Sequence, residues 1–322
     1  RRSLGSKGMN GKNYTHVAVG NLNVDIAIYV DRVPAPGEVL TALGVDMRPG
    51  GAATNYAVAV AQYGHKVYLV ASTSNSEYVK TTLTTLKELG VNIDKIKLVD
   101  EFPGLVVIIV QAGGERTMIK YPGANRELSA DDVSHDLLEN AHLVHMASIS
   151  PDLAADIGKK CTRRAVLVTY DPGIYADALR NAIPTLIENI DVLFLNEREL
   201  MHIAKHAKVD VLFKHGLSTL VVKMGQRGAT VLLPSGTCYH GVAQPIKRPV
   251  DSTGAGDAFN AFFNAKYLES KNLSLALAYG VAAGALKVGF RGSFLRLDHK
   301  LFKLQLKKVV VEKPAECPAE FN

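Results

Sequence analysis

Short apolar runs alternate with longer amphipathic stretches along most of the 322-residue chain. The apolar runs are rich in Val, Leu and Ile and have the length of buried strands; they are His16–Val19, Val67–Val70, Leu143–Met146, Ala165–Thr169, Val192–Leu195 and Thr219–Lys223. The stretches between them carry apolar residues at helical spacing, as in Asn55–Tyr63, Ser76–Leu89, Ala176–Asn189 and Ala258–Glu269. Buried strands that alternate with helices predict an α/β fold, in which a mostly parallel central sheet lies between two helical layers.

Two regions without helical spacing interrupt this alternation. Residues 26–46 hold β-like segments around two prolines and a glycine, and residues 105–121 read as two strands on either side of the Gly113-Gly114 turn. We interpret both regions as one small β-sheet lid. The expected organisation is a flexible tail (1–13), an α/β domain that carries the lid (14–308) and a C-terminal tail (309–322).

Composition and charge narrow the class of partner. The formal net charge is +6, and part of the excess lies near the two ends of the chain, where charge is usually solvated, so we expect no nucleic-acid partner. No apolar run reaches the roughly 18 residues of a membrane span, and the basic, polar N-terminus does not resemble a signal peptide. Cys161, Cys238 and Cys317 are few and far apart, which predicts neither a disulfide framework nor a zinc site and favours a reducing cytoplasm.

The most informative motif is the nonamer Asp251–Phe259, which reads Asp-Ser-Thr-Gly-Ala-Gly-Asp-Ala-Phe. Gly254 and Gly256 allow a tight turn, and the amphipathic run that follows places the N–H groups of the turn at a helix N-terminus. Oriented N–H donors and the helix dipole bind anions, so the nonamer predicts a phosphate-binding turn.

Asp257 is an unexpected residue in such a turn, because its carboxylate would repel a phosphate. The charge is explained if the carboxylate takes the proton of an acceptor hydroxyl while the hydroxyl oxygen attacks a γ-phosphate. The simpler structural alternative is that Asp257 is an acidic residue that only caps the first turn of a helix.

The nonamer resembles the C-terminal signature of the ribokinase-like (PfkB) family, and Gly50–Ala57 resembles the N-terminal signature of that family. The resemblance runs from about His16 to Ser293 and looks nearest to archaeal nucleoside and sugar kinases. It implies a ribokinase-like three-layer sandwich with a lid, and an ATP-dependent, Mg²⁺-requiring kinase that phosphorylates a hydroxymethyl group of a sugar or nucleoside. The implied catalytic residues are the base Asp257 and the turn residues Gly254, Ala255 and Gly256.

The resemblance also assigns residues to the substrates and to the metal. Acceptor contacts are expected from Asn23, Asp25, Gly50, Gly51, Asn55 and Arg116. Contacts with ATP are expected from Asn196, Lys223, Gly225, Gly228, Gly254 and Gly256. The metal ligands implied are Glu199, acting through water in an Asn-x-x-Glu element, and Asp251. A carboxylate such as Asp25 accepts hydrogen bonds from vicinal hydroxyls, which suits a polyol or a ribose.

The sequence departs from the family after Val67–Val70, where many members have a Gly-x-Asp turn and this chain has Ala-Ser-Thr-Ser-Asn. That difference puts in doubt any substrate or oligomer contact made by this loop. Residues 285–293 stand where some members bind a monovalent cation, so such an ion is a further candidate. Asp171-Pro172-Gly173 matches a family landmark, although a plain turn is the simpler explanation.

Other classes of nucleotide site are excluded, because the chain has neither a Gly-x-x-x-x-Gly-Lys-Ser/Thr motif nor a Gly-x-Gly-x-x-Gly after its first strand. Two alternatives stay open. One is a kinase of a sugar phosphate, for which the candidate basic residues are Arg48, Arg116 and Lys120. The other is a non-catalytic relative that only senses a ligand.

The predicted lid bears on the oligomeric state. Val106 and Ile108 alternate with Val107 and Ile109, so both faces of the lid are apolar. One face would meet the active site, and the other needs a cover. The resemblance implies a homodimer through the lids; the alternative is a monomer whose lid folds onto its own large domain.

Overall fold

A computed structural model describes residues 14–113, 115–162, 164–204, 209–246 and 249–317, so the predicted N-terminal tail lies outside the described residues. In this part of the chain a 10-stranded sheet forms the centre of the molecule. Its order is β14 (Val309–Glu312), β13 (Cys238–Ala243), β12 (Ala229–Leu232), β11 (Thr219–Lys223), β10 (Val192–Asn196), β9 (Leu167–Asp171), β8 (Leu143–Ala147), β1 (Thr15–Gly20), β4 (Lys66–Ser74) and β5 (Ile96–Val99). Neighbours from β5 to β11 are parallel, which confirms the predicted mostly parallel sheet.

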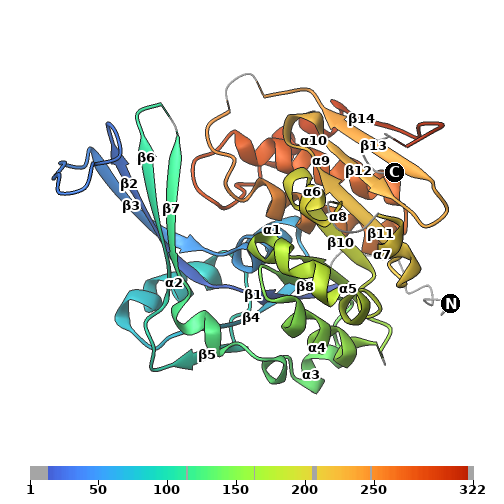
Figure 1. The fold of residues 1–322 in the computed structure, drawn as a ribbon, viewed down its shortest axis with the longest axis horizontal. Coiled ribbons are helices and arrows are strands. Elements are labelled where there is room, and N and C mark those ends of the chain that lie inside the picture. Colours follow the sequence, from blue (N-terminus) through green and yellow to red (C-terminus); the bar gives the residue numbers. More distant parts are fainter. Residues whose placement is uncertain (1–13, 114, 163, 205–208, 247–248, 318–322) are drawn as a thin grey trace.

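Helices cover both faces of the sheet (Figure 1). One layer consists of α1 (Ala52–Tyr63), α2 (Glu77–Glu88), α8 (Ala255–Ser270), α9 (Leu273–Val288) and α10 (His299–Leu306). The other consists of α3 (His135–Glu139), α4 (Pro151–Cys161), α5 (Leu179–Ile187), α6 (Glu197–Ala204) and α7 (Asp210–Lys214). Short 3₁₀ segments are η1 (Gly123–Glu127), η2 (Ala130–Asp132), η3 (Gly173–Ala178) and η4 (Gly225–Arg227).

Strand side chains alternate between these two layers. In β10, Leu193 and Leu195 pack with α4 to α7, whereas Val192 and Phe194 pack against α8 and α9. Because both faces are covered, the strands read as continuous apolar runs. The carboxyl ends of β9, β10 and β11 and the N-terminus of α8 then supply the polar residues described below.

A second sheet stands away from the α/β body, at the upper left of Figure 1. Its order is β3 (Gly44–Gly50), β2 (Asn23–Val30), β6 (Gly104–Gln111) and β7 (Arg116–Tyr121), with β2 and β6 parallel and the outer pairs antiparallel. The two segments interpreted as a lid supply these strands, and residues 31–43 connect β2 to β3. The sheet continues further toward the body than expected, since β2 begins at Asn23 and β3 ends at Gly50. Gly114, in the predicted turn, lies outside the described residues.

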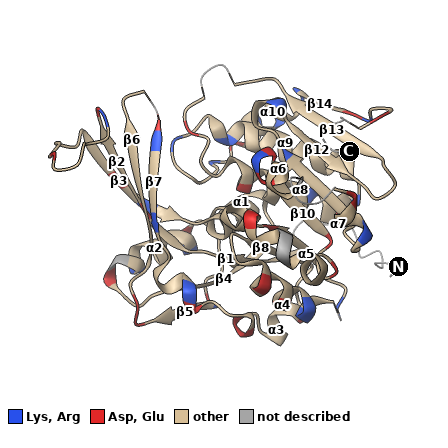
Figure 2. Cartoon of the chain, viewed as in Figure 1, with Lys and Arg blue, Asp and Glu red and all other residues tan. Residues whose placement is uncertain are grey.

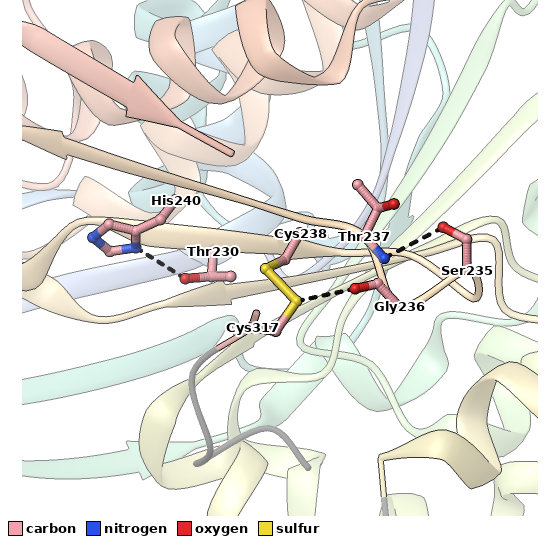
Figure 3. The surroundings of a disulfide bond; sticks show 7 residues. All are labelled: Thr230, Ser235, Gly236, Thr237, Cys238, His240 and Cys317. Carbon is pink, nitrogen blue, oxygen red and sulfur yellow. Dashed lines mark hydrogen bonds between the residues drawn. A yellow bond between two sulfur atoms is a disulfide. The ribbon is translucent and has the colours of Figure 1, made fainter. Parts of the chain in front are cut away.

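The C-terminal region differs from the prediction. Residues 309–312 are not a tail but form β14, which pairs antiparallel with β13. The chain therefore runs back along β13, and Cys317 is brought to Cys238 with a Cα–Cα distance of 5.8 Å, where the two form a disulfide (Figure 3). The expectation of unpaired cysteines was wrong because the partners are 79 residues apart and only the β13–β14 pairing brings them together. The argument from cysteines for a reducing cytoplasm does not hold. Cys161 is free and buried.

Within the described ranges, no helix has the length and apolar character needed to cross a bilayer. Acidic and basic residues are interspersed along the elements in the cartoon of Figure 2, and the blue of basic residues recurs along β7 of the lid.

Candidate active site

The nonamer forms a turn that leads directly into helix α8. Gly254 is the N-cap residue with φ 76°, and a Cβ atom there would lie 1.9 Å from the Ser293 carbonyl oxygen. Only glycine fits this left-handed, crowded position. Ala255 and Gly256 begin the helix. The Ala255 N–H donates to the Ser252 carbonyl over 3.2 Å, whereas the helix offers no partner to the N–H groups of Gly256 and Asp257, which are available to an anion. We call residues 251–256 the anion turn.

Asp251, the first residue of the anion turn, is the centre of the contacts that hold the turn. Asp251 accepts hydrogen bonds from the Thr253 N–H through Oδ1 and from the Gly292 N–H through Oδ2, each over 2.9 Å. Arg116, on lid strand β7, makes a 3.0 Å ion pair with Asp251 Oδ1 and donates to Thr253 Oγ1. Burial raises the pKa of Asp251, but the hydrogen bonds from Thr253 and Gly292 outweigh it and hold this pKa below its usual value. Asp251 therefore shapes the turn, and Arg116 joins the lid to the turn. The role of Asp251 as a metal ligand stays a prediction.

Asp257 lies in the first turn of α8, and its Oδ2 accepts a 2.7 Å hydrogen bond from Nδ2 of Asn55 in α1. Burial raises the pKa of Asp257 to about 7, although the hydrogen bond from Asn55 and the ammonium of Lys223 act in the opposite direction. A carboxylate with a pKa near neutrality can accept a proton from a hydroxyl and release it again. The two sequence signatures thus meet at one carboxylate.

The acceptor residues expected from the sequence cluster where the lid joins the body. Asp25 is buried, its Oδ1 has no hydrogen-bond partner among the described residues, and burial raises its pKa to about 6. A Cβ atom at Gly50 would lie 2.1 Å from the Asp25 carboxylate, so the glycine makes room for it. Gly51 has φ 104° and passes against the Asn21 carbonyl. An unpartnered buried carboxylate is suited to receive ligand hydroxyls.

Asn23 takes part in a hydrogen-bond network where the lid joins the body. Its Oδ1 accepts a 2.8 Å hydrogen bond from Asn125 Nδ2, and Asn125 Oδ1 accepts from the Leu22 N–H over 3.0 Å. Asn125 follows the lid strand β7 in sequence, and this network ties it to the start of β2. Sequence reasoning did not assign Asn125 to the site.

Three side chains form a buried polar cluster beneath the anion turn. Lys223 Nζ, at the end of β11, donates to Asp171 Oδ2 over 2.5 Å and to Asn260 Oδ1 over 3.3 Å. Asn260 Nδ2 donates to the same Asp171 oxygen over 2.7 Å. Although burial opposes ionisation, Lys223 and Asn260 hold the pKa of Asp171 below its usual value. Asp171 is thus more than a turn former, and Asn260 was missed because nothing in a helix interior distinguishes it.

A cavity of about 430 Å³ opens beside the anion turn. Its lining includes the expected Lys223, Gly225, Gly228 and Gly256, together with residues that sequence reasoning missed: Ala243, Gln244, Pro245, Ile246, Pro249, Phe259, Val281, Gly284, Ala285 and Val288. The missed residues are mainly apolar. An apolar slot that ends at an anion-binding helix terminus fits a flat base and its phosphates.

Asn196 and Glu199 cap helix α6 reciprocally. Glu199 Oε2 accepts from the Asn196 N–H over 2.8 Å, and Asn196 Oδ1 accepts from the Glu199 N–H over 2.9 Å. Burial and the neighbouring charge of Asp171 raise the pKa of Glu199 to about 7. Asn196 is exposed and does not line the cavity. Among the described residues no group of three or more His, Cys, Asp or Glu side chains is arranged to hold a metal by itself, so a cation here would need phosphate oxygens or water as further ligands.

Fold, anion turn and carboxylate together define the class of this protein as a small-molecule kinase of ribokinase fold. Residues 15–298 match the family model described as pfkB family carbohydrate kinase. An ATP-dependent ribose-1-phosphate kinase of Halopiger xanaduensis is 30% identical over 284 residues, which are 86% of this chain and 93% of that protein. The chain belongs to the pfkB family of carbohydrate kinases.

Solved structures agree with this assignment. Arabidopsis thaliana ribokinase, complexed with ribose and ATP, matches with a TM-score of 0.79 and 26% identity over 92% of this chain and 99% of that chain. The fold is also that of the Methanocaldococcus jannaschii nucleoside kinase, with a TM-score of 0.79, 23% identity and coverage of 93% and 100%. The predicted ribokinase-like fold is confirmed.

Proposed function

We propose that this kinase transfers the γ-phosphate of ATP to a hydroxymethyl group of a sugar or nucleoside, with Asp257 as general base. The observation that carries the proposal is the place of the Asp257 carboxylate, which lies at the start of α8 next to the anion turn and has a pKa near 7. The alternative of a helix cap is weaker, because the carboxylate accepts its hydrogen bond from Asn55 of a different helix.

Each group has a distinct task. The unpartnered Asp25 carboxylate accepts hydrogen bonds from acceptor hydroxyls and turns the hydroxymethyl group toward Asp257. Asp257 takes the proton, and the N–H groups of the anion turn stabilise the charge of the transferred phosphoryl group. Mg²⁺, when bound, would neutralise the phosphate charge, and Glu199 is the carboxylate suited to hold its water.

The base is tested by Asp257→Asn. The variant should fold and bind ATP as the wild type does, while kcat falls by about 10²–10⁴-fold. The matched control is Asp152→Asn, which removes an exposed acidic residue from the first turn of α4. A folded Asp257→Asn variant with wild-type turnover would refute the base, and a wild type that binds ATP but forms no ADP with any acceptor would favour the ligand-sensing alternative.

A sugar phosphate is the second candidate acceptor, because two basic residues flank Asp25 in one row across the lid. The pairings Asp25–Arg48, Asp25–Val106 and Val106–Lys120 place Arg48 and Lys120 on the same face as Asp25. Burial lowers the pKa of Lys120, and the nearby Asp25 carboxylate counteracts this. Arg48 also forms a 3.1 Å ion pair with Asp46, and the phosphate of a ribose phosphate would give Arg48 and Lys120 a further anionic partner.

The two acceptors are separated by measuring ADP formation with ribose, ribose 1-phosphate, fructose 6-phosphate, adenosine and cytidine. If the acceptor carries a phosphate, Lys120→Met should raise its KM by about tenfold or more and leave the KM for ribose nearly unchanged. Lys80→Met, on the exposed side of α2, is the control. Turnover of free sugars or nucleosides alone rejects the second candidate.

We further propose a homodimer through the outer face of the lid. This face carries Met47, Ile26, Val107 and Ile119 in one paired row and Val45, Ile28 and Ile109 in the next. Ile119 is 61% exposed and Val45 is 64% exposed. Apolar area of this kind on a β-sheet favours a protein partner, and a second copy offers a matching surface.

Sedimentation at micromolar concentration tests the dimer. Ile119→Lys or Val107→Lys should yield the 34.7 kDa monomer. Met118→Lys is the control, because Met118 is 55% exposed on the opposite face of the same strand. A monomeric wild type contradicts the proposal, and a dimer that survives the outer-face changes moves the interface elsewhere.

A further inference from the structure

Lys287 is a lysine without solvent access. It lies in the last turn of α9 in the run Ala282–Val288 and is 0% exposed. Lysine is rarely buried completely, because an ammonium group loses its hydration unless other groups replace the water. The partners of Lys287 therefore show what its charge is used for.

The ammonium group binds two backbone carbonyls. Lys287 Nζ donates to the carbonyl oxygen of Asp251 over 2.8 Å and to that of Phe290 over 3.2 Å. Asp251 begins the anion turn, and Phe290 begins the loop after α9. The N–H groups of Val250 and Asp251 both donate to the Val288 carbonyl, so the two segments lie side by side with the ammonium between them.

The same two segments are joined at further points. Gly292, in the loop after α9, donates its N–H to Asp251 Oδ2 over 2.9 Å. The Ser293 carbonyl lies against Gly254, where it leaves no room for a side chain. The position of the loop that contains Phe290, Gly292 and Ser293 thus fixes the position of the anion turn.

Charges around Lys287 are of both signs. The carboxylates of Asp251 and Asp257 favour its charged form, and Arg48 and Arg116 disfavour it. Burial, the largest influence, lowers the pKa of Lys287 to about 8, which leaves the group charged at neutral pH. A positive charge is therefore built into the protein behind the anion turn.

Residues 285–293 were expected to offer a place for a monovalent cation, and the groups present do not fit one. A free cation of this kind is held by backbone carbonyls, yet the Asp251 and Phe290 carbonyls already accept from an ammonium group. A second cation on the same oxygens would stand within a few ångströms of Nζ, where two positive charges repel strongly at low dielectric.

We propose that the Lys287 ammonium group serves as a built-in monovalent cation that positions the anion turn, so that turnover needs no added potassium or ammonium ion. Lys287 is a positioning residue, since it acts on the reacting phosphate only through the turn. The proposal concerns the kinase reaction proposed above, and it is tested by turnover and by thermal stability, of which the second does not depend on that reaction.

The first experiment uses the wild-type enzyme, freed of potassium and ammonium ions. Its turnover and its Tm should be the same in KCl as in choline chloride at equal ionic strength. Saturable activation by KCl of about tenfold or more, the size expected for a bound cation that orders the turn, would overturn the proposal.

The second experiment removes the ammonium with Lys287→Ala. Turnover in choline chloride should fall about 100-fold, and about 100 mM KCl or methylammonium chloride should restore it by about tenfold, because the small cation enters the space left behind. The same salts should raise the Tm of the variant by about 2 °C and leave the wild type unchanged.

Lys87→Ala is the matched control, since Lys87 occupies the last turn of α2 with its side chain exposed. It should show neither loss nor rescue. A Lys287→Ala variant that keeps full turnover in choline chloride, or that is not rescued by any small cation in turnover or Tm, contradicts the proposal. Should this variant not fold, Lys287→Met replaces it in choline chloride only, because the Met side chain leaves little space for a small cation. Full turnover of Lys287→Met would contradict the proposal.

Discussion

Asn55 Nδ2 donates a 2.7 Å hydrogen bond to Asp257 Oδ2 and so joins the first turn of α1 to the first turn of α8 across 202 residues of sequence. One carboxylate oxygen is thereby held in place, and the carboxylate cannot rotate freely. The amide also favours the ionised form of Asp257, against the effect of burial. Asn55 is therefore expected to set the pH range of the enzyme as well as the direction of its base.

Asn55→Leu should move the acidic limb of the pH profile. The base acts when it is deprotonated, so kcat/KM falls as the pH drops below the pKa of about 7. Without the amide this pKa rises, and the midpoint of the limb should move to higher pH by roughly one unit. The profile of kcat/KM between pH 5 and 9, taken at saturating ATP, measures the shift. An unchanged midpoint in a folded variant would show that Asn55 does not tune Asp257.

Glu199→Gln should raise the Mg²⁺ concentration needed for half-maximal rate by about tenfold, because a neutral amide holds metal-bound water less well. The pKa of Glu199 is raised to about 7, so the Mg²⁺ requirement of the wild type should also increase as the pH falls below 7 and the carboxylate is protonated. Rates over a Mg²⁺ titration at pH 6 and pH 8 test both effects. Glu77→Gln, at the first turn of α2, is the control. Identical titrations for Glu199→Gln and wild type would make Glu199 a capping residue only.

Cys317→Ser should lower the free energy of unfolding by about 2–4 kcal/mol, because the disulfide closes a loop of 79 residues and restricts the unfolded chain. Turnover should remain, since neither cysteine lines the cavity beside the anion turn. Denaturant unfolding with and without dithiothreitol measures the effect. The reductant should destabilise the wild type and have no further effect on Cys317→Ser. Equal stability of the reduced and oxidised wild type would contradict the prediction.

Buried neutral histidines should make the fold sensitive to acid. His16 binds Tyr56 and His65 at 2.8 Å and 3.0 Å, and His145 binds Thr169 at 2.8 Å. Burial lowers the pKa of His145 to about 3 and that of His16 well below its usual value.

An unfolded chain takes up these protons below about pH 6.5, so the free energy of unfolding should fall by roughly 1.4 kcal/mol per pH unit for each such histidine. Unfolding measured from pH 7.5 to 4.5 gives the slope. His145→Phe keeps a ring beside Tyr56 and should reduce this slope by the contribution of about one histidine. A stability that does not change over this range would contradict the assignment of neutral histidines.

The sheet was predictable from local pattern, and its exceptions have a clear cause. The run predicted as Val67–Val70 extends to Ser74, because Ser72 and Thr73 are buried beside β5 although they read as a polar loop. Likewise, β14 was taken as tail because a short run of valines near the end of a chain has no periodicity that distinguishes it. The extension of β4 and the whole of β14 depend on pairing with a neighbouring strand.

In the candidate site, the nonamer signature predicted the residues that lie in or next to the anion turn, such as Gly254 and Asp257. The residues that were missed act across the fold. Lys287 reads as an ordinary lysine near a helix C-terminus, and no local pattern shows that its side chain reaches the Asp251 carbonyl. Asn260 and Asn125 are similar, since their partners are far away in sequence.

The joints between lid and body are very short. Two residues separate β1 from β2, and Gly51 alone separates β3 from α1. Asp25 lies on the lid side of the first joint, and Asn55 lies just inside the body beyond the second. We therefore expect a tilt of the lid to move the acceptor bound to Asp25 and, through the Gly51 joint, the Asn55 amide that orients Asp257. We expect that without a bound acceptor the lid does not hold Asn55 and Asp257 in this arrangement, so that water does not attack the nucleotide.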